Sequence, residues 1–162
     1  MERRDKHNYY LDIAETTIER ATCIRRKFGS VIVKNDEIIA TGYNGAPRGR
    51  KNCTDIGICI REKLNVPRGV RYELCRSVHA EANAIISASR RDLMGATLYL
   101  VCKDGATDEL VAGMNSCAMC KRLIINSGIK DVIIRDDKDN YRVIDTNEWI
   151  VNDESLEDNF GY

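Results

Sequence analysis

The chain has 162 residues, a length that suits one compact domain with a hydrophobic core and disfavours a second domain. Its 25 lysines and arginines balance its 25 aspartates and glutamates, so no overall positive charge attracts nucleic acid or a membrane, and we expect a small molecule or another protein as partner. Because no apolar run reaches the length of a membrane span and the charged start lacks the apolar segment of a secretory signal, we expect a cytoplasmic protein.

The first half of the chain predicts a helix, a hairpin and an irregular segment. Residues 8–22 place apolar side chains at helical spacing, and residues 30–47 hold two β-rich runs around the polar residues 34–37, followed by a glycine-rich loop. Residues 49–76 are irregular and charged and contain three cysteines. Such a segment needs something to hold it in place.

The second half predicts two helices and three strands. Residues 79–89 and 117–126 are typical of helices, with Gly128 placed to end the second, and residues 96–101 are typical of a buried strand. Residues 103–116 look like a loop or insertion. Residues 130–136 and 141–145 are strands joined by a short turn, so we expect them to be antiparallel. We assign residues 1–150 to a single domain and residues 151–162 to an acidic tail.

Three polar side chains at the expected helix starts suggest a metal site. Cys117 and Cys120 are three residues apart and lie on one side of a helix start, where free N–H groups lower thiol pKa values. Alone, the pair fits two buried thiols, a redox pair or half a metal site, and His79 alone is more often a core or surface residue. Together they form a His/Cys/Cys set that leaves a tetrahedral zinc ion one position for water.

The motifs His79-Ala80-Glu81 and Ser116-Cys117-Ala118-Met119-Cys120 resemble the H-x-E and P-C-x-x-C signature of zinc deaminases. Ser116 replaces the usual proline, from which we expect altered loop geometry and no loss of chemistry. Glu81 is the expected catalytic residue, because a carboxylate beside the water can carry its proton to the ring and the leaving amine. Positions i and i+2 point roughly 200° apart within a helix, so both His79 and Glu81 must lie in the first turn, with the helix starting near residue 77 or 78.

The stretches TGYNGAPRG and ELCRSVHAEANAI resemble bacterial-type deoxycytidylate deaminases, and the resemblance extends over residues 8–134. It implies a three-layer α/β/α cytidine deaminase-like fold, with a mixed sheet of about five strands whose last two we expect to be antiparallel. It also implies zinc-dependent hydrolysis of dCMP to dUMP and ammonia. By resemblance, Asn44 holds sugar and base, the Ala80 N–H meets the pyrimidine O2, and the Asn115 carbonyl accepts from the exocyclic amine.

The phosphate of such a substrate needs cationic partners. Most arginines and lysines near these loops are plain solvated charges, and of them we name Arg26 and Arg48 as phosphate contacts. Some deoxycytidylate deaminases hold a second, structural zinc on cysteines that match Cys23 and Cys53. A set formed by Cys23, Cys53, Cys59 and Cys75 would anchor the irregular segment, and separate buried thiols are the alternative.

The resemblance also implies partners and leaves alternatives. Family members form oligomers, often hexamers, that respond to dCTP and dTTP, so Mg²⁺ bound with a nucleoside triphosphate effector is a further expectation. One alternative is a deaminase of free cytidine or guanine, or of a tRNA or DNA base, and a requirement for the 5′-phosphate discriminates. The other is a non-catalytic nucleotide-binding oligomer, against which Glu81 argues because a structural zinc needs no proton shuttle.

Overall fold

The computed structural model describes residues 1–157, and its centre is a five-stranded mixed sheet. The strands follow the spatial order β2-β1-β3-β4-β5, with only β3 and β4 parallel. They comprise β1 (Arg26–Lys34), β2 (Glu37–Tyr43), β3 (Thr97–Asp104), β4 (Asp131–Arg135) and β5 (Tyr141–Asp145). The predicted mixed sheet, with antiparallel last strands, is confirmed.

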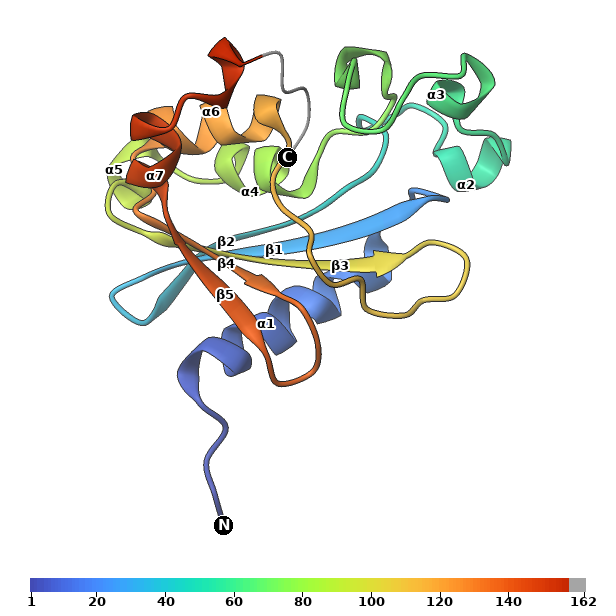
Figure 1. Cartoon of the computed structure of the whole chain (residues 1–162). Helices are drawn as coiled ribbons and strands as arrows, with labels where there is room; N and C mark the ends of the chain where they lie inside the picture. Colours follow the sequence, from blue (N-terminus) through green and yellow to red (C-terminus); the bar gives the residue numbers. More distant parts are fainter. Residues whose placement is uncertain (158–162) are drawn as a thin grey trace.

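Helices cover both faces of this sheet (Figure 1). On one face lies α1 (Lys6–Thr17), which contacts β1, β3 and β4. The other face carries four helices, namely α4 (Ala80–Ile86), α5 (Arg90–Leu93), α6 (Ala118–Ser127) and α7 (Thr146–Val151). The three-layer α/β/α expectation is therefore confirmed.

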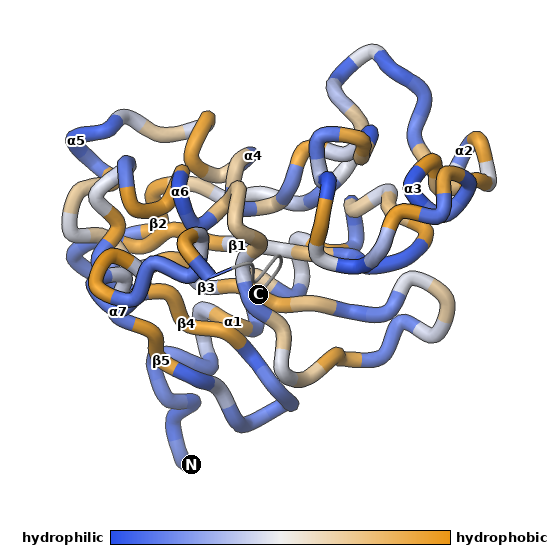
Figure 2. Tube along the Cα trace, turned by 45° about the horizontal axis from the view of Figure 1, so that its top comes forward, coloured by the Kyte–Doolittle hydropathy of each residue, from blue (hydrophilic) through white to orange (hydrophobic). Residues whose placement is uncertain are grey.

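Alternation along the strands creates a separate core on each face. Within β3, Leu98 and Leu100 pack into the cluster that contains Ile124 of α6, whereas Tyr99 and Val101 pack into the cluster that contains Leu11 of α1. Successive strand side chains point to opposite faces, so a continuous apolar run marks a strand buried on both. Figure 2 shows these central strands as largely hydrophobic and the N-terminal segment as hydrophilic.

The element boundaries follow local chemistry. The Asp5 side chain accepts from the Asn8 N–H and starts α1, which ends earlier than predicted and continues as the 3-10 helix η1 (Ile18–Arg20). Asn35 and Asp36 take positive φ values of 52° and 61° and connect β1 to β2 in a tight turn. As predicted, Gly128 ends α6, in the left-handed conformation at φ 83°.

Several short elements were not predicted from the sequence. The irregular segment contains α2 (Cys53–Ile56), α3 (Ile60–Lys63) and the 3-10 helix η2 (Tyr72–Leu74), and Figure 1 shows α2 and α3 beyond one end of the sheet. The predicted domain boundary at residue 150 falls inside α7, and η3 (Glu154–Leu156) lies in the predicted tail. Residues 158–162 of that tail lie outside the described residues. Within residues 1–157, no helix has the length and apolar character needed to cross a membrane.

A buried arginine fastens α1 to the sheet. The Arg135 side chain, 1% exposed at the end of β4, donates to Asp12 at 2.8 Å, to Glu15 at 2.7 Å and to the Asn8 backbone oxygen at 3.2 Å. Its charge is thus compensated by two carboxylates on the helix that covers this face. Burial acts to raise the pKa of Asp12, but hydrogen bonds from Arg4 and Arg135 outweigh that effect and hold the pKa below its usual range.

We predict that Arg135→Met lowers the free energy of unfolding at pH 7 by about 1–3 kcal/mol, since the two carboxylates it leaves behind are still partly solvated. A carboxylate whose pKa is depressed in the folded state stabilises above its unfolded pKa of about 3.9 and loses that contribution as the pH falls. The difference between the two proteins should therefore shrink below about pH 4. Urea denaturation of both proteins at pH 7 and at pH 3 measures this difference.

The control for this comparison is Arg20→Met, which removes an exposed arginine in η1 and should change the unfolding free energy by less than about 0.5 kcal/mol. A difference between wild type and Arg135→Met that stayed constant down to pH 3 would contradict the assigned role of the ion pair with Asp12.

Candidate active site

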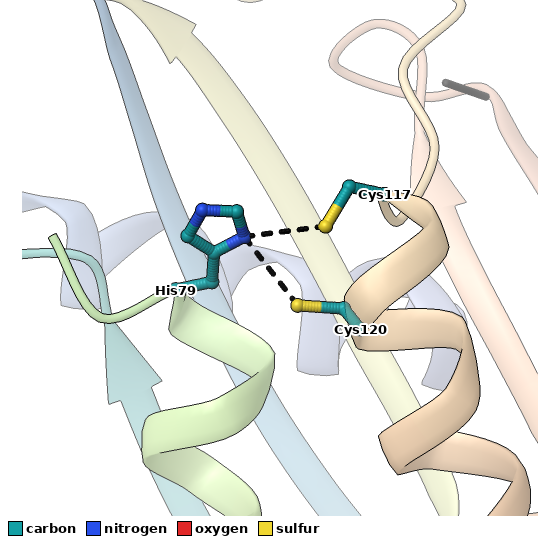
Figure 3. Close-up of side chains that lie close together, drawn as sticks. All are labelled: His79, Cys117 and Cys120. Carbon is teal, nitrogen blue, oxygen red and sulfur yellow. Dashed lines mark hydrogen bonds between the residues drawn. The ribbon is translucent and has the colours of Figure 1, made fainter. Parts of the chain in front are cut away.

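Two helix starts bring a histidine and two cysteines together. His79 is the N-cap of α4 and Cys117 is the N-cap of α6. The His79 Nδ1 atom lies 3.5 Å from the Cys117 sulfur and 3.4 Å from the Cys120 sulfur (Figure 3). Within the part of the chain that the structure describes, these three residues form the one group of metal-binding side chains with ligand atoms all within 4.8 Å.

The arrangement fits a zinc ion. A tetrahedral zinc with a nitrogen about 2.0 Å and a sulfur about 2.3 Å away holds the two ligand atoms about 3.5 Å apart, close to both observed nitrogen–sulfur distances. One imidazole nitrogen and two thiolates are also a ligand set that zinc favours. These three residues would hold the metal and leave one position of a tetrahedron for another ligand.

The three side chains share protons through hydrogen bonds, and a divalent cation would take the place of these protons. A hydrogen bond from the Cys120 thiol lowers the pKa of Cys117 to about 4, and His79 contributes in the same direction against the effect of burial. The same shared hydrogen bond raises the pKa of Cys120. Burial acts to lower the pKa of His79, but hydrogen bonds with Cys117 and Cys75 raise it to about 10. Metal binding would displace these protons.

A glycine in β2 sets the position of α4. A Cβ atom on Gly42 would lie 2.2 Å from the Ala80 carbonyl oxygen and 2.7 Å from the Ala84 nitrogen, so only glycine permits this close approach. The Ser30 hydroxyl donates to the same Ala80 carbonyl at 2.8 Å. Just before the helix, Gly45 and Val78 exchange two backbone hydrogen bonds. The sheet thereby fixes where the helix begins.

The helix begins at Ala80, later than the start near residue 77 or 78 that the sequence predicted, but His79 and Glu81 both lie at its beginning. His79 precedes the helix in extended backbone conformation and Glu81 is its second residue, so the two side chains need not point 200° apart as they would at mid-helix. Glu81 is 3% exposed, and burial raises the pKa of its carboxyl group. A buried carboxyl group with a raised pKa beside a metal-binding set is suited to transfer protons.

Ser116 contacts Glu81, a contact that was not predicted from the motif. Its hydroxyl, fully buried, donates to the Glu81 Oε1 atom at 2.9 Å. The signal was present as the departure from the usual proline, which we interpreted only as a change in loop shape. A hydroxyl directly before the first metal-binding cysteine can orient the catalytic carboxylate.

A cavity of about 440 Å³ opens onto this group, and nine residues predicted as catalytic, metal-binding or substrate-binding line it. They are Cys23, Arg26, Asn44, Cys59, Cys75, His79, Glu81, Asn115 and Cys117. Ala80 is the first residue of α4, where N–H groups lack acceptors within the helix. Arg48 is exposed and is not among the described residues that line the cavity, so the structure does not bring it to the site.

Asn44 has a structural task at the cavity wall. Its Oδ1 atom accepts from the Phe28 N–H at 2.9 Å, and its Nδ2 atom donates to the Arg26 carbonyl at 2.8 Å. The side chain thus satisfies two backbone groups at the start of β1, beside the cavity. An amide oxygen has two lone pairs and an amide nitrogen has two hydrogens, so these contacts leave capacity for a ligand.

The insertion forms part of the wall. Gly105 N–H donates to the Arg25 carbonyl at 2.8 Å, and Gly113 N–H donates to Asp136 at 2.8 Å, so both ends of the loop are fastened. Ala106 and Asn115 face the cavity from this loop. The insertion predicted at residues 103–116 is therefore a wall of the site.

The other predicted cysteine set does not assemble. Cys23, Cys59 and Cys75 line the cavity and Cys53 is buried in α2, but among residues 1–157 no three of these sulfurs form a metal-binding group. Each is a free thiol, and Cys75 forms a hydrogen bond with His79. Burial is the larger cause of the raised pKa of Cys23, and Cys53 and Cys75 still lie near enough for their charges to raise it further, but the sulfur atoms are not all within 4.8 Å of one another.

Comparisons with known proteins agree with this geometry. The pattern of the family described as the cytidine and deoxycytidylate deaminase zinc-binding region matches residues 4–135. A deoxycytidylate deaminase of Mycobacterium phage D29 is 38% identical over 138 residues, which cover 82% of this chain and 96% of the phage protein. A deoxycytidylate deaminase of Schizosaccharomyces pombe is 33% identical over 126 residues, covering 78% of this chain but only 35% of the yeast protein.

A solved structure extends the likeness to three dimensions. The dCMP deaminase of cyanophage S-TIM5 in its apo form superposes with a TM-score of 0.57 at 25% sequence identity, covering 85% of this chain and 88% of the cyanophage chain. The sheet order and both helix starts described above therefore belong to a fold that is shared beyond this sequence.

We predict about one zinc ion per chain in the purified, zinc-loaded protein, because a single set of ligands converges within residues 1–157. Cys120→Ala should lower the zinc content well below one per chain, and Cys59→Ala, which removes another cavity thiol, should leave it unchanged. Elemental mass spectrometry after dialysis measures both. A content of two that falls to one in Cys59→Ala would instead show that the four other cysteines bind a structural zinc.

Proposed function

Because the chain belongs to the family of zinc-dependent cytidine and deoxycytidylate deaminases, we propose that it hydrolyses dCMP to dUMP and ammonia. The observation that carries the proposal is the buried Glu81 carboxyl group in the same cavity as the His79, Cys117 and Cys120 set. The 38% identity to a phage deoxycytidylate deaminase over nearly its whole length supports the substrate. The reaction provides deoxyuridylate, a precursor of thymidylate.

The chemistry divides between the metal and Glu81. Zinc held by the three ligands would supply an activated water at neutral pH. Glu81 accepts the first proton of the attacking water and delivers it to N3 as the oxygen bonds to C4. Glu81 then takes the second proton from the new C4 hydroxyl group and passes it to the exocyclic amine, the C4–N bond breaks as the C4=O bond forms, and ammonia leaves. Ser116 holds the carboxylate for these transfers through its 2.9 Å hydrogen bond.

The predicted substrate contacts extend this proposal. The Ala80 N–H at the helix start suits the pyrimidine O2, and the Asn115 carbonyl suits the amine, because the loop carrying it faces the cavity. Asn44 retains hydrogen-bonding capacity for the sugar or base. Of the two predicted phosphate contacts, Arg26 lies in the cavity wall, paired with Asp104, and Arg48 lies outside.

Assembly, regulation and location are finer parts of the proposal. Apolar side chains are exposed on the neighbouring helices α4, α6 and α7, and they support a homo-oligomer; they are Ile86, Leu123, Ile150 and Val151. Response to dCTP and dTTP, with Mg²⁺, is retained from the family resemblance. A reducing, cytoplasmic location suits two ligand cysteines that must stay as thiolates.

Glu81→Gln should reduce turnover of dCMP by roughly 10²- to 10⁴-fold, because an amide cannot carry the proton, while zinc content stays unchanged. Ammonia release from dCMP, deoxycytidine, CMP and dCTP measures the activity and its substrate range. The control is Glu37→Gln, at an exposed position in the hairpin, which should behave as wild type. Unchanged turnover in Glu81→Gln would remove Glu81 from the mechanism, and no release from any of the four compounds would overturn dCMP deamination.

Ser116→Ala should lower kcat for dCMP by about tenfold with little change in KM, because Glu81 loses a charge-assisted hydrogen bond that fixes its carboxylate. Ser77→Ala provides the matched control. Ser77 lines the same cavity, but its buried hydroxyl makes no hydrogen bond to Glu81. Steady-state kinetics on both zinc-loaded variants measures kcat and KM for dCMP. Equal kcat values for the two variants would show that the hydroxyl of Ser116 does not orient Glu81.

A further inference from the structure

Arg61 is a buried, rigidly held arginine in the wall of the active-site cavity. It lies on α3, is 5% exposed and is one of the residues lining the cavity. Its Nη2 atom donates to the Pro67 carbonyl at 2.9 Å and to the Val70 carbonyl at 2.6 Å. Its guanidinium carbon lies 4.3 Å from the centre of the Tyr72 ring. These contacts fix the direction of the side chain before any ligand arrives.

Within residues 1–157, Arg61 forms no ion pair. Among residues 1–157, no carboxylate oxygen lies within 4.0 Å of its guanidinium, and its buried Nε atom has no hydrogen-bond partner. The two nearest glutamates in sequence are already paired, Glu62 with Arg25 at 2.8 Å and Glu73 with Arg71 at 2.7 Å. A buried charge without a counter-ion is unfavourable, so an anion in the cavity would stabilise this arrangement.

The other buried arginine shows what a purely structural role requires. Arg135 is as deeply buried as Arg61, yet two carboxylates lie within 2.8 Å of it. At the cavity, Arg25 and Arg26 are likewise paired with Glu62 and Asp104. Fastening the loop through two backbone carbonyls accounts for one nitrogen of Arg61, but it supplies no ion pair within residues 1–157, and the charge of Glu73 acts on Arg61 only from beyond 4.0 Å. Arg61 is thus a rigidly held cation in the cavity wall that is available to pair with an anionic ligand.

The position of Arg61 relative to the metal ligands suits a nucleotide. The Tyr72 ring that stacks on Arg61 also meets the His79 ring edge-on, with ring centres 5.2 Å apart. One tyrosine therefore contacts both the guanidinium and a metal-binding residue. A substrate that carries its reacting base at one end and its anion at the other can reach both groups within this cavity.

We propose that Arg61 binds the 5′-phosphate of the substrate and is the residue that makes the enzyme select a nucleoside monophosphate over the nucleoside. This inference rests on the proposed deamination of dCMP. A guanidinium is suited to the task, because its planar fork of N–H donors matches phosphate oxygens and it cannot lose its charge. The segment containing α3 then has a function beyond closing the cavity, since it supplies the anion site.

The test compares kcat/KM for dCMP and for deoxycytidine in the zinc-loaded protein. Arg61→Gln should lower the value for dCMP about a hundredfold and change that for deoxycytidine less than about threefold, because only dCMP carries the phosphate. Arg61→Lys should recover part of the loss. Lys63→Gln, which removes an exposed cation from the same helix, is the matched control and should retain the wild-type preference.

The outcomes separate this inference from the proposed function. If wild type does not deaminate dCMP, the proposed function fails, and the inference that depends on it fails with it. If wild type prefers dCMP and Arg61→Gln keeps that preference, or loses activity on both substrates equally while remaining folded, only the role of Arg61 is overturned. Melting temperature and zinc content establish the folded state of each variant.

A measurement on the wild-type protein covers the case in which neither variant folds. The product dUMP should slow amide hydrogen exchange in residues 59–72 more than deoxyuridine does at equal site occupancy, because only dUMP supplies the anion that engages Arg61. Equal protection of this segment by the two compounds would overturn the inference.

Discussion

The site depends on one close approach between a strand and a helix. At Gly42 of β2, the backbone of α4 comes so near that a single methyl group would lie 2.2 Å from the Ala80 carbonyl oxygen. This contact, with the Ser30 hydrogen bond to the same carbonyl, fixes the first turn of the helix against the sheet. His79 lies just before that turn and Glu81 within it. A shift of the helix would separate Glu81 from Cys117 and Cys120, so the same packing contact holds together the residues of the proposed chemistry.

The parallel pair of strands provides the second half of the site. Parallel strands cannot be joined by a tight turn, so the chain must cross from β3 to β4 over one face, and α6 is part of that crossover. Its N-cap, Cys117, comes to lie opposite the N-cap of α4. Helix starts stabilise negative charge, and two of them meet here where two thiolates and a carboxylate are needed. The sheet topology thereby collects the polar groups at one place.

The sequence predicted those features of the fold that depend on interactions between residues close together along the chain. Apolar runs in β3 and β4 identified the buried strands, the short turn before residue 141 indicated an antiparallel end, and the spacing of Cys117 and Cys120 identified a helix start. What it did not predict depends on contacts between distant segments. The partnership of Ser116 with Glu81 joins residues 35 positions apart, and the positions of three of the other cysteines depend on three short helices that lack clear periodicity.

Three buried ionisable side chains show how one fold handles charge in different ways. Arg135 is balanced by carboxylates on α1 and connects two layers. Glu81 has its pKa raised by burial and is steadied by one hydroxyl, so it can hold a proton or release it. Arg61 has no carboxylate within 4.0 Å in the described chain. Arg135 has its ion-pair partners within the protein. The roles proposed for Glu81 and Arg61 instead require a substrate in the cavity that carries a reactive base and an anionic group.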